Sequence, residues 1–212
     1  MHSSVFALLQ LAASAALLAL LLGPARPAHA HPGHMHRCPP PLGKFPFDAQ
    51  KFSGEWFVVA RTPLLKIPDV DSKCHKFTYS TESQGNETRV SMKITIKTDE
   101  KAMEPEVKGH FSNRPNAGSV MQGVWRPSAG DKWMPGVFTT SVLVTDYDTY
   151  AVTVTCKEMY FDKTDSFDRL LIPHVLSRTP ELEANALAVL KNVLTGIDID
   201  EDTIKDQDNS GC

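Results

Sequence analysis

The stretch 90–98 carries the feature that most constrains the fold. Apolar and hydrophilic residues alternate there strictly, with Val90, Met92, Ile94 and Ile96 separated by Ser91, Lys93, Thr95 and Lys97. Successive side chains of a β-strand point to opposite faces, so this alternation is typical of a strand with one dry and one wet face. The apolar set must face an interior, because Lys93 and Lys97 belong in water.

Seven further short runs of β-type residues accompany this strand and are separated by turn residues. Pro173, in the last run, lacks a backbone N–H and should therefore lie at a bulge or at a sheet edge. Eight strands at short spacing predict an all-β domain, either an up-and-down barrel or a sandwich. We expect the strands over 56–62, 76–81, 90–98, 107–111, 120–126, 137–145, 150–156 and 167–177.

One amphipathic helix is expected after the strands, over 179–196. Thr179 suits the N-cap and Pro180 the first helical position, while Gly196 is placed to end the helix in a left-handed cap. A helix with one apolar stripe needs an apolar surface to pack against. The stripe comprises Leu182, Ala186, Val189, Leu190, Val193 and Leu194.

The first thirty residues have the layout of a secretory signal peptide. An apolar run from Val5 to Leu22 is followed by Gly-Pro and by Ala28-His29-Ala30, a small-residue cleavage site. Cleavage after Ala30 predicts a secreted, extracellular chain without a transmembrane anchor; a retained anchor is the alternative. The rest divides into a Pro- and His-rich arm (31–51), the β-domain (52–178), the helix (179–196) and a tail (197–212).

Composition limits the chemistry. The chain has four cysteines, Cys38, Cys74, Cys156 and Cys212. In a secreted chain an even number predicts two disulfides, and three connectivities remain open. The wide spacing, without C-x-x-C, argues against a zinc or redox site. A net charge of −3 without a basic cluster argues against nucleic acid as a partner.

Three motifs occur in an order that resembles the lipocalin family. Gly54-Glu55-Trp56 opens the first strand, and Thr145-Asp146-Tyr147-Asp148-Thr149-Tyr150-Ala151 forms a hairpin. Leu176-Ser177-Arg178-Thr179-Pro180 leads into the helix. The resemblance covers residues 38–212 and is greatest to the branch that contains apolipoprotein D, retinol-binding protein and the bilin-binding lipocalins.

The resemblance implies an eight-stranded antiparallel barrel, the lipocalin calyx, open at one end and with one C-terminal helix packed outside. It also implies the pairings Cys38–Cys156 and Cys74–Cys212. The structural motif residues are Gly54, Trp56, Thr145, Asp146, Tyr147 and Arg178. In this arrangement Trp56 would plug the closed end, and Arg178 would lie over its ring as a cation–π partner. Compared with the usual family pattern, we expect the connections 127–136 and 157–165 to be several residues longer.

The period of two then predicts which side chains face the lumen. If Cys38 lies in the arm outside the barrel, Cys156 must point outward, and alternate residues along its strand face inward. The resemblance places Val142 on the inward face as well. Packing near the closed end is the alternative role for any of these residues. The expected ligand-binding set is Phe77, Tyr79, Met92, Ile94, Ile96, Val107, Phe111, Val142, Ala151, Thr153 and Thr155.

Other signals carry less weight. Three histidines, His31, His34 and His36, remain in the arm after cleavage and are not taken as a metal site. Asp198 and the acidic residues after it resemble a calcium loop but lack its glycine and its bidentate glutamate. No metal and no cofactor is expected. Asn86-Glu87-Thr88 is a glycosylation sequon in a turn.

The sequence thus predicts a secreted protein that carries or stores a small hydrophobic or amphipathic molecule, and not an enzyme. By the resemblance, candidate ligands are a bilin, retinoid, carotenoid, sterol or fatty acid, so a bound chromophore or lipid is possible. The alternatives are a lipocalin-type isomerase or synthase, which a free thiol would favour, and an extracellular protein-interaction module. A homo-oligomer or a receptor is a possible partner.

Overall fold

The computed structural model describes residues 37–63, 72–114, 117–128, 132–197 and 199–212. The predicted signal peptide and the arm histidines lie outside these residues, as does Asp198. All statements below concern the described part of the chain.

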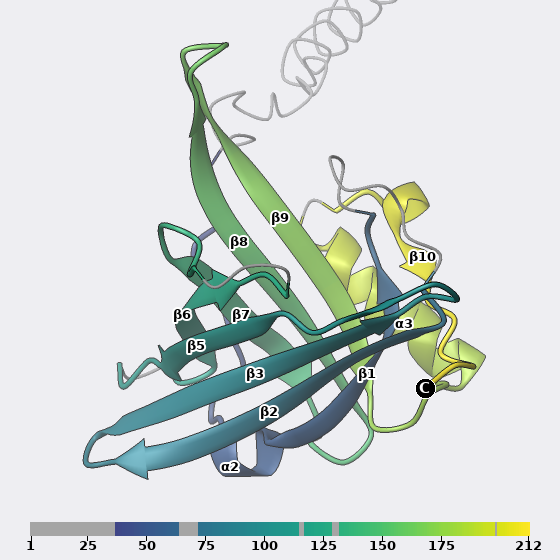
Figure 1. Cartoon of the computed structure of the whole chain (residues 1–212). Coiled ribbons are helices and arrows are strands. Elements are labelled where there is room, and N and C mark those ends of the chain that lie inside the picture. The colour runs from purple at the N-terminus through teal and green to yellow at the C-terminus, as the bar shows by residue number, and fades with distance from the viewer. Residues whose placement is uncertain (1–36, 64–71, 115–116, 129–131, 198) are drawn as a thin grey trace, which may run out of the picture. The chain divides into compact units, whose positions relative to one another are not determined.

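Eight long strands form one antiparallel sheet that closes on itself (Figure 1). The order is β10-β1-β2-β3-β5-β6-β7-β8-β9, and pairing of β1 with β9 closes the barrel. The elements are α2 (Ala49–Phe52), β1 (Gly54–Arg61), β2 (Cys74–Gln84), β3 (Glu87–Lys97), β4 (Ala102–Met103), β5 (Glu106–Phe111), β6 (Val120–Arg126), β7 (Phe138–Thr145), β8 (Tyr150–Phe161), β9 (Ser166–Ser177), α3 (Ala184–Thr195), η2 (Glu201–Thr203) and β10 (Lys205–Asp206).

The eight predicted strands and the up-and-down order are confirmed. The sequence patterns gave no sign of the two-residue strands β4 and β10, or of α2, a single turn capped by the Asp48 carboxylate. These elements are too short for periodicity to reveal them. The pairing of β9 with β1 ends at His174, which lies opposite Arg61. Pro173 is the next residue and has no partner on β1, so on this side of β9 it occupies the predicted edge position.

The hairpin of β8 and β9 is longer than predicted. β7 pairs with β8 as far as Cys156, and β1 pairs with β9 as far as His174, but the two long strands continue pairing to Phe161 and Ser166. Figure 1 shows this hairpin reaching well beyond its neighbours. The expected extension of 157–165 therefore consists of regular strand over 157–161 and a turn over 162–165.

Alternation along the strands produces two separate apolar clusters. Ala151 belongs to the cluster inside the barrel, whereas Val152 and Val154 belong to a second cluster outside it. Leu190 and Leu194 of α3 are buried in that outer cluster. The inward and outward assignment of β8, and the packing of the helix on the barrel wall, are thus confirmed.

Two expectations about the helix are wrong. The helix starts at Ala184, because the Glu183 carboxylate accepts hydrogen bonds from the backbone N–H groups of Asn185 and Ala186, both at 3.0 Å. Thr179 is not the N-cap. Gly196 ends the helix in a right-handed conformation (φ −64°), because its N–H donates within the helix.

The expected apolar stripe of this helix is also wrong at one position. Val189 is 64% exposed and is not part of the outer cluster. Leu187, which the expected stripe does not include, packs against that cluster.

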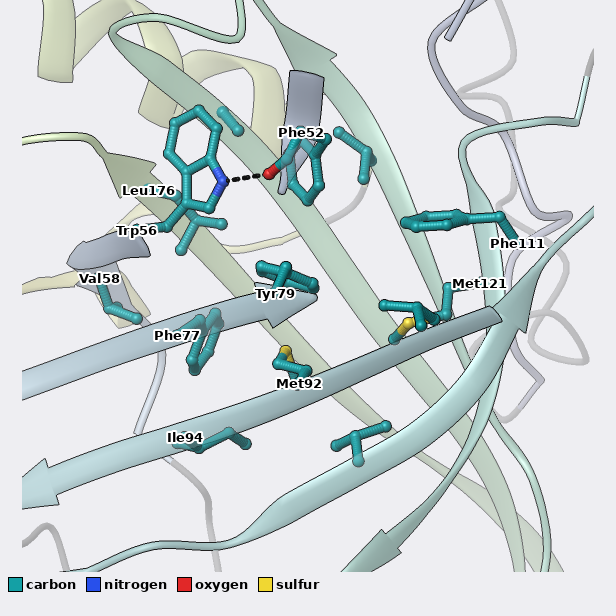
Figure 2. Close-up of a cluster of buried hydrophobic side chains, with 14 residues drawn as sticks. Phe52, Trp56, Val58, Phe77, Tyr79, Met92, Ile94, Phe111, Met121 and Leu176 are labelled. Atoms are coloured by element: carbon teal, nitrogen blue, oxygen red, sulfur yellow. Dashed lines mark hydrogen bonds between the residues drawn. The ribbon is translucent and has the colours of Figure 1, made fainter. Parts of the chain in front are cut away.

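The closed end is organised by Arg178 and Trp56. The Arg178 guanidinium carbon lies 3.7 Å from the centroid of the Trp56 ring, as a cation–π contact. Trp56 is fully buried, and its Nε1 donates to the Phe52 carbonyl at 2.8 Å (Figure 2). Arg178 also donates to four backbone carbonyls, those of Lys51, Ser53, Glu55 and Tyr147, at 2.7–3.0 Å. One side chain therefore joins α2, β1 and the β7–β8 hairpin.

The second motif forms that hairpin. The Asp146 carboxylate accepts from the backbone N–H groups of Asp148, Thr149 and Tyr150 at 2.8–3.2 Å. Partial burial raises the pKa of Asp146, but these hydrogen bonds outweigh it and the net shift is downward. The motif residues fix a turn and carry no reactive group.

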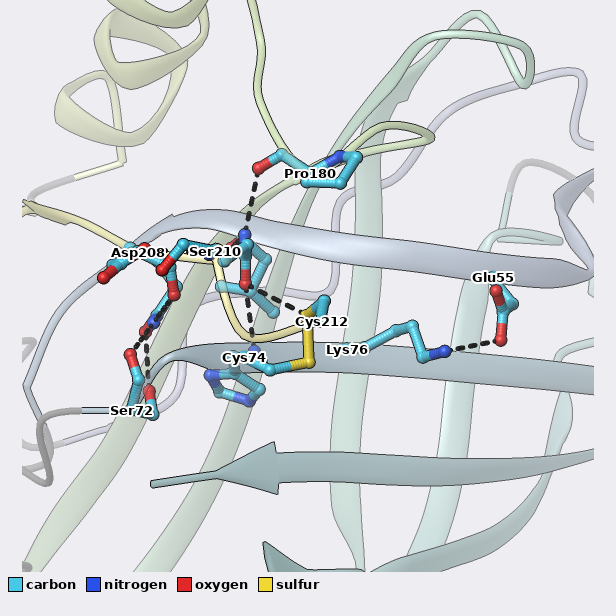
Figure 3. Close-up of a disulfide and its surroundings, with 12 residues drawn as sticks. Glu55, Ser72, Cys74, Lys76, Pro180, Asp208, Ser210 and Cys212 are labelled. Carbon is cyan, nitrogen blue, oxygen red and sulfur yellow. Dashed lines mark hydrogen bonds and ion pairs between the residues drawn. A yellow bond between two sulfur atoms is a disulfide. The ribbon is translucent and has the colours of Figure 1, made fainter. Parts of the chain in front are cut away.

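The two disulfides are Cys38–Cys156 and Cys74–Cys212, which confirms the expected pairing. Figure 3 shows the second of them, Cys74–Cys212. They span 118 and 138 residues, so in the chain-entropy model each contributes at most about 4–5 kcal/mol. The tail is held further by Asn209, which is buried. Its side chain accepts from the His75 N–H at 3.0 Å and donates to the Val58 carbonyl at 2.8 Å.

Truncating the closed end should destabilise the whole barrel. We expect Trp56→Ala to lower the free energy of unfolding by about 3–5 kcal/mol, the usual cost of removing a buried aromatic ring. Arg178→Ala should lower it by about 2 kcal/mol or more, because four carbonyls lose their donor. Chemical denaturation measures both changes. An Arg178→Lys variant that is fully as stable as the parent would show that the forked hydrogen bonds do not matter.

Candidate functional site: the barrel lumen

The barrel contains a cavity between the closed end and the open mouth. The space among its lining atoms amounts to about 660 Å³, a volume that includes solvent at the open mouth. Every long strand except β1 contributes to its wall. The lining residues are His75, Phe77, Tyr79, Met92, Ile94, Ile96, Val107, Met121, Trp125, Phe138, Thr140, Thr153, Thr155, Ile172 and His174.

Most of the residues predicted to face a ligand lie in this wall. Phe77, Tyr79, Met92, Ile94, Ile96, Val107, Thr153 and Thr155 line the cavity (Figure 2 shows several of them). Phe111, Val142 and Ala151 point inward but belong to the packed cluster below the cavity. For these three, closed-end packing describes their position better than cavity lining.

Several residues on β2, β6, β7 and β9 line the cavity although the sequence patterns did not predict them as ligand contacts. His75 precedes Phe77 by two positions, so extending the alternation on β2 by one more step of two residues predicts that His75 also faces inward. On β9 the inward residues Ile172 and His174 flank Pro173, which obscures the alternation. Met121 and Trp125 each lie two positions from Gly123, whose missing side chain interrupts the period on β6. The remaining residues that were not predicted as ligand contacts are Phe138 and Thr140.

The polar atoms of the wall differ in how they are satisfied. The hydroxyls of Thr140 and Thr155 lie 2.8 Å apart and bond to each other, so Thr155 does not need a ligand as its partner. In contrast, the indole Nε1 of Trp125 is buried and has no hydrogen-bond partner among the described residues. A buried donor without a partner is costly, and Trp125 is one of the residues that line the cavity.

Two buried histidines complete the wall near its mouth. Burial lowers the pKa of His75 well below its ordinary value, and its electrostatic interactions with His174 and Arg61 lower it further. Burial and then Arg61 lower the pKa of His174 to about 3. Burial also raises the pKa of Tyr79. At neutral pH all three lumen groups are therefore uncharged, so the wall presents no net charge to a ligand.

The described part of the chain contains no cluster of three or more His, Cys, Asp or Glu side chains that could hold a metal ion. Within the same residues, no helix has the length and hydropathy needed to cross a membrane. All four cysteines are in disulfides, so the lumen contains no thiol.

Comparison with known proteins gives relatives along most of the chain. It is 26% identical to apolipoprotein D of Rattus norvegicus over 196 residues, which cover 92% of this chain and 95% of that protein. It is 24% identical to retinol-binding protein 4-B of Oncorhynchus mykiss, over 64% of this chain and 76% of that protein. No protein-family model matches the chain.

Solved structures show the same fold. Insecticyanin from the tobacco hornworm Manduca sexta superposes with a TM-score of 0.58 at 22% identity, over 82% of this chain and 86% of insecticyanin. Apocrustacyanin C2 superposes with a TM-score of 0.54 at 16% identity, over 74% and 77% of the two chains.

The unpaired indole N–H of Trp125 can be tested by substitution. Trp125→Phe removes the unsatisfied donor, which should stabilise the fold, and replaces the indole by a smaller aromatic ring, which should destabilise it. These two effects should nearly cancel. We expect the free energy of unfolding to stay within about 1 kcal/mol of the parent. Trp125→Ala should cost about 3 kcal/mol, because packing is lost. Equal destabilisation of both variants in urea would mean that the N–H is satisfied in the native protein.

Proposed function

We propose that the chain belongs to the lipocalin family, on its sequence similarity to apolipoprotein D and retinol-binding protein and on its barrel fold, and that it binds one small, largely apolar molecule in the barrel lumen. Lipocalins as a family bind small hydrophobic ligands. An eight-stranded barrel has room for one such molecule.

The observation that carries this proposal is the composition of the cavity wall. Aromatic and aliphatic side chains make up most of it, while the ionisable groups among them are neutral at physiological pH. Burial of apolar ligand surface against such a wall supplies the driving force for binding. A few polar atoms, with the Trp125 N–H foremost, would orient the ligand.

The wall favours a ligand that is mostly hydrocarbon and carries at least one polar group. A purely hydrocarbon guest would leave the Trp125 donor without a partner. Retinoids, sterols, fatty acids and the oxygenated carotenoids meet this description. Bilins combine an apolar ring system with more polar groups. Retinol is the first compound to test, because one relative is named for binding it.

We further propose that the protein is secreted and carries or stores its ligand outside the cell. Both disulfides tie distant parts of the chain together, which is typical of proteins from oxidising compartments. Asn86 lies in the exposed turn between β2 and β3, where a glycan would meet no steric hindrance. Binding requires no reaction on the ligand, and with every cysteine in a disulfide a lumen thiol is not available for one.

A charge placed in the lumen should abolish binding. Ile94 lies in the cavity wall and is 5% exposed, so Ile94→Asp would bring an unpaired carboxylate into the apolar site. Ser91→Asp is the matched control, because this residue is exposed on the outward face of the same strand. Lys93 is less suitable, since it forms an ion pair with Glu104.

The measurement is a titration of each folded variant with retinol, followed by quenching of tryptophan fluorescence. We expect affinity to fall at least tenfold for Ile94→Asp, which corresponds to about 1.4 kcal/mol, and to be unchanged for Ser91→Asp. Parallel loss in both variants would place the ligand elsewhere. If neither retinol nor any of the other candidate ligands named above binds, a protein-interaction role is favoured.

Secretion is tested separately. Expression of the full chain in animal cells should release a protein into the medium that begins at His31 and bears one glycan. Asn86→Gln should remove that glycan without changing ligand affinity. Mass spectrometry of the secreted protein reads both features. A protein that is retained in the cells with residues 1–30 intact would contradict the proposal.

A further inference from the structure

The mouth of the lumen contains a pair of imidazoles that the apolar binding described above does not require. His75 comes from β2 and His174 from β9, and their ring centroids are 5.9 Å apart. The Phe77 ring packs edge-on against both, with centroid distances of 5.3 and 4.9 Å. Each histidine is 8% exposed and lines the cavity.

The charges around this pair are positive. Arg61, at the end of β1, pairs with His174 in the sheet and acts on both imidazoles. Across from His75, β3 contributes Ile96, and across from His174, β8 contributes Thr153. Tyr79, further along β2, is un-ionised.

In the part of the chain that the structure describes, no carboxylate acts on either imidazole. The tail reaches His75 through the Asn209 amide, which is neutral. As far as the described residues go, a positive charge on this pair would be repelled by Arg61 and by the second imidazole, and no described carboxylate would balance it.

An anion is the component that would complete this arrangement. A negative group between the imidazoles would cancel the repulsion from Arg61 and from the second imidazole. It would also turn an imidazole N–H into a charge-assisted hydrogen-bond donor, which is about twice as strong as a neutral one. A neutral hydroxyl gains neither effect. The apolar wall below the histidines would receive the rest of the molecule.

We propose that His75 and His174 bind the anionic head group of an amphiphile whose hydrocarbon part fills the lumen, and that one imidazole takes up a proton from solvent as this head group binds. The inference rests on the proposed binding in the lumen and specifies the class of ligand. A carboxylate on a hydrocarbon chain is the simplest molecule of this class.

Proton uptake makes the affinity depend on pH in a defined direction. The free imidazoles stay neutral down to acid pH, whereas the imidazole beside a bound anion is protonated more readily. Affinity for an anion should therefore rise as pH falls. If the pKa of one imidazole returns to its ordinary value of 6.5 on binding, the dissociation constant should drop about tenfold between pH 7.5 and 5.5.

The probe must be an anion that cannot itself be protonated, because a carboxylic acid could enter the lumen in its neutral form. We suggest hexadecanesulfonate, used below its micelle concentration, and hexadecanol as the neutral partner of equal length. Quenching of tryptophan fluorescence gives both affinities at each pH. We expect the sulfonate to bind about tenfold more tightly at pH 5.5 than at 7.5, and the alcohol to show no such change.

His75→Gln and His174→Gln test the residues. At least one of them should remove the pH dependence for the sulfonate, while affinity for the alcohol, whatever its value in that variant, stays independent of pH. A cooperative unfolding transition in urea shows that each variant is folded. His110→Gln is the matched control, since His110 is exposed on β5. In NMR titrations, the pKa of at least one of the two lumen imidazoles should rise on binding sulfonate but not on binding alcohol.

The outcomes separate the two proposals. If neither probe nor retinol binds, the lumen function itself is wrong. If alcohol and sulfonate bind equally and without pH dependence, the lumen function stands and the anion proposal is wrong. Sulfonate affinity that changes with pH equally in the parent and in both lumen histidine variants would also overturn it.

Discussion

The contact between Arg178 and Trp56 is the constraint on which the rest of the barrel depends. The guanidinium covers the indole ring and, by donating to four carbonyls, holds α2, the start of β1 and the β7–β8 hairpin in fixed positions. These segments close one end of the barrel. Because that end is sealed by packed side chains, the cavity can open only at the other end, and the inward residues between the two ends become its wall.

The lumen owes its properties to alternation and to burial acting together. Alternation brings apolar side chains to the inner face, and the outer face of β8 meets α3. Burial then determines the protonation state of the few ionisable groups inside, so that His75, His174 and Tyr79 are neutral. The result is a dry, uncharged site with a small number of donors, which suits an apolar molecule with a polar end.

Sequence periodicity predicted the parts of this structure that are repeated over many residues. The face of the strand around Ile94 follows from Lys93 and Lys97 alone, and the motifs around Trp56 and Arg178 led to the closed end and to the disulfide pairing. Periodicity fails where one residue interrupts it. Pro173 hid His174, Gly123 hid Trp125, and a glutamate in place of Thr179 supplies the helix cap. Whether an inward residue lines the cavity or packs below it depends on distance along the barrel axis, which no local pattern encodes.

Occupation of the lumen is tested most directly by the methionine methyl groups. Met92 and Met121 line the cavity, whereas Met103, Met134 and Met159 lie outside its wall. Selective ¹³C-methyl labelling followed by titration with retinol or with a long-chain anion reports on all five at once. The account predicts that the Met92 and Met121 resonances shift on binding, while the other three stay in place. Binding that leaves Met92 and Met121 unmoved would contradict the central claim.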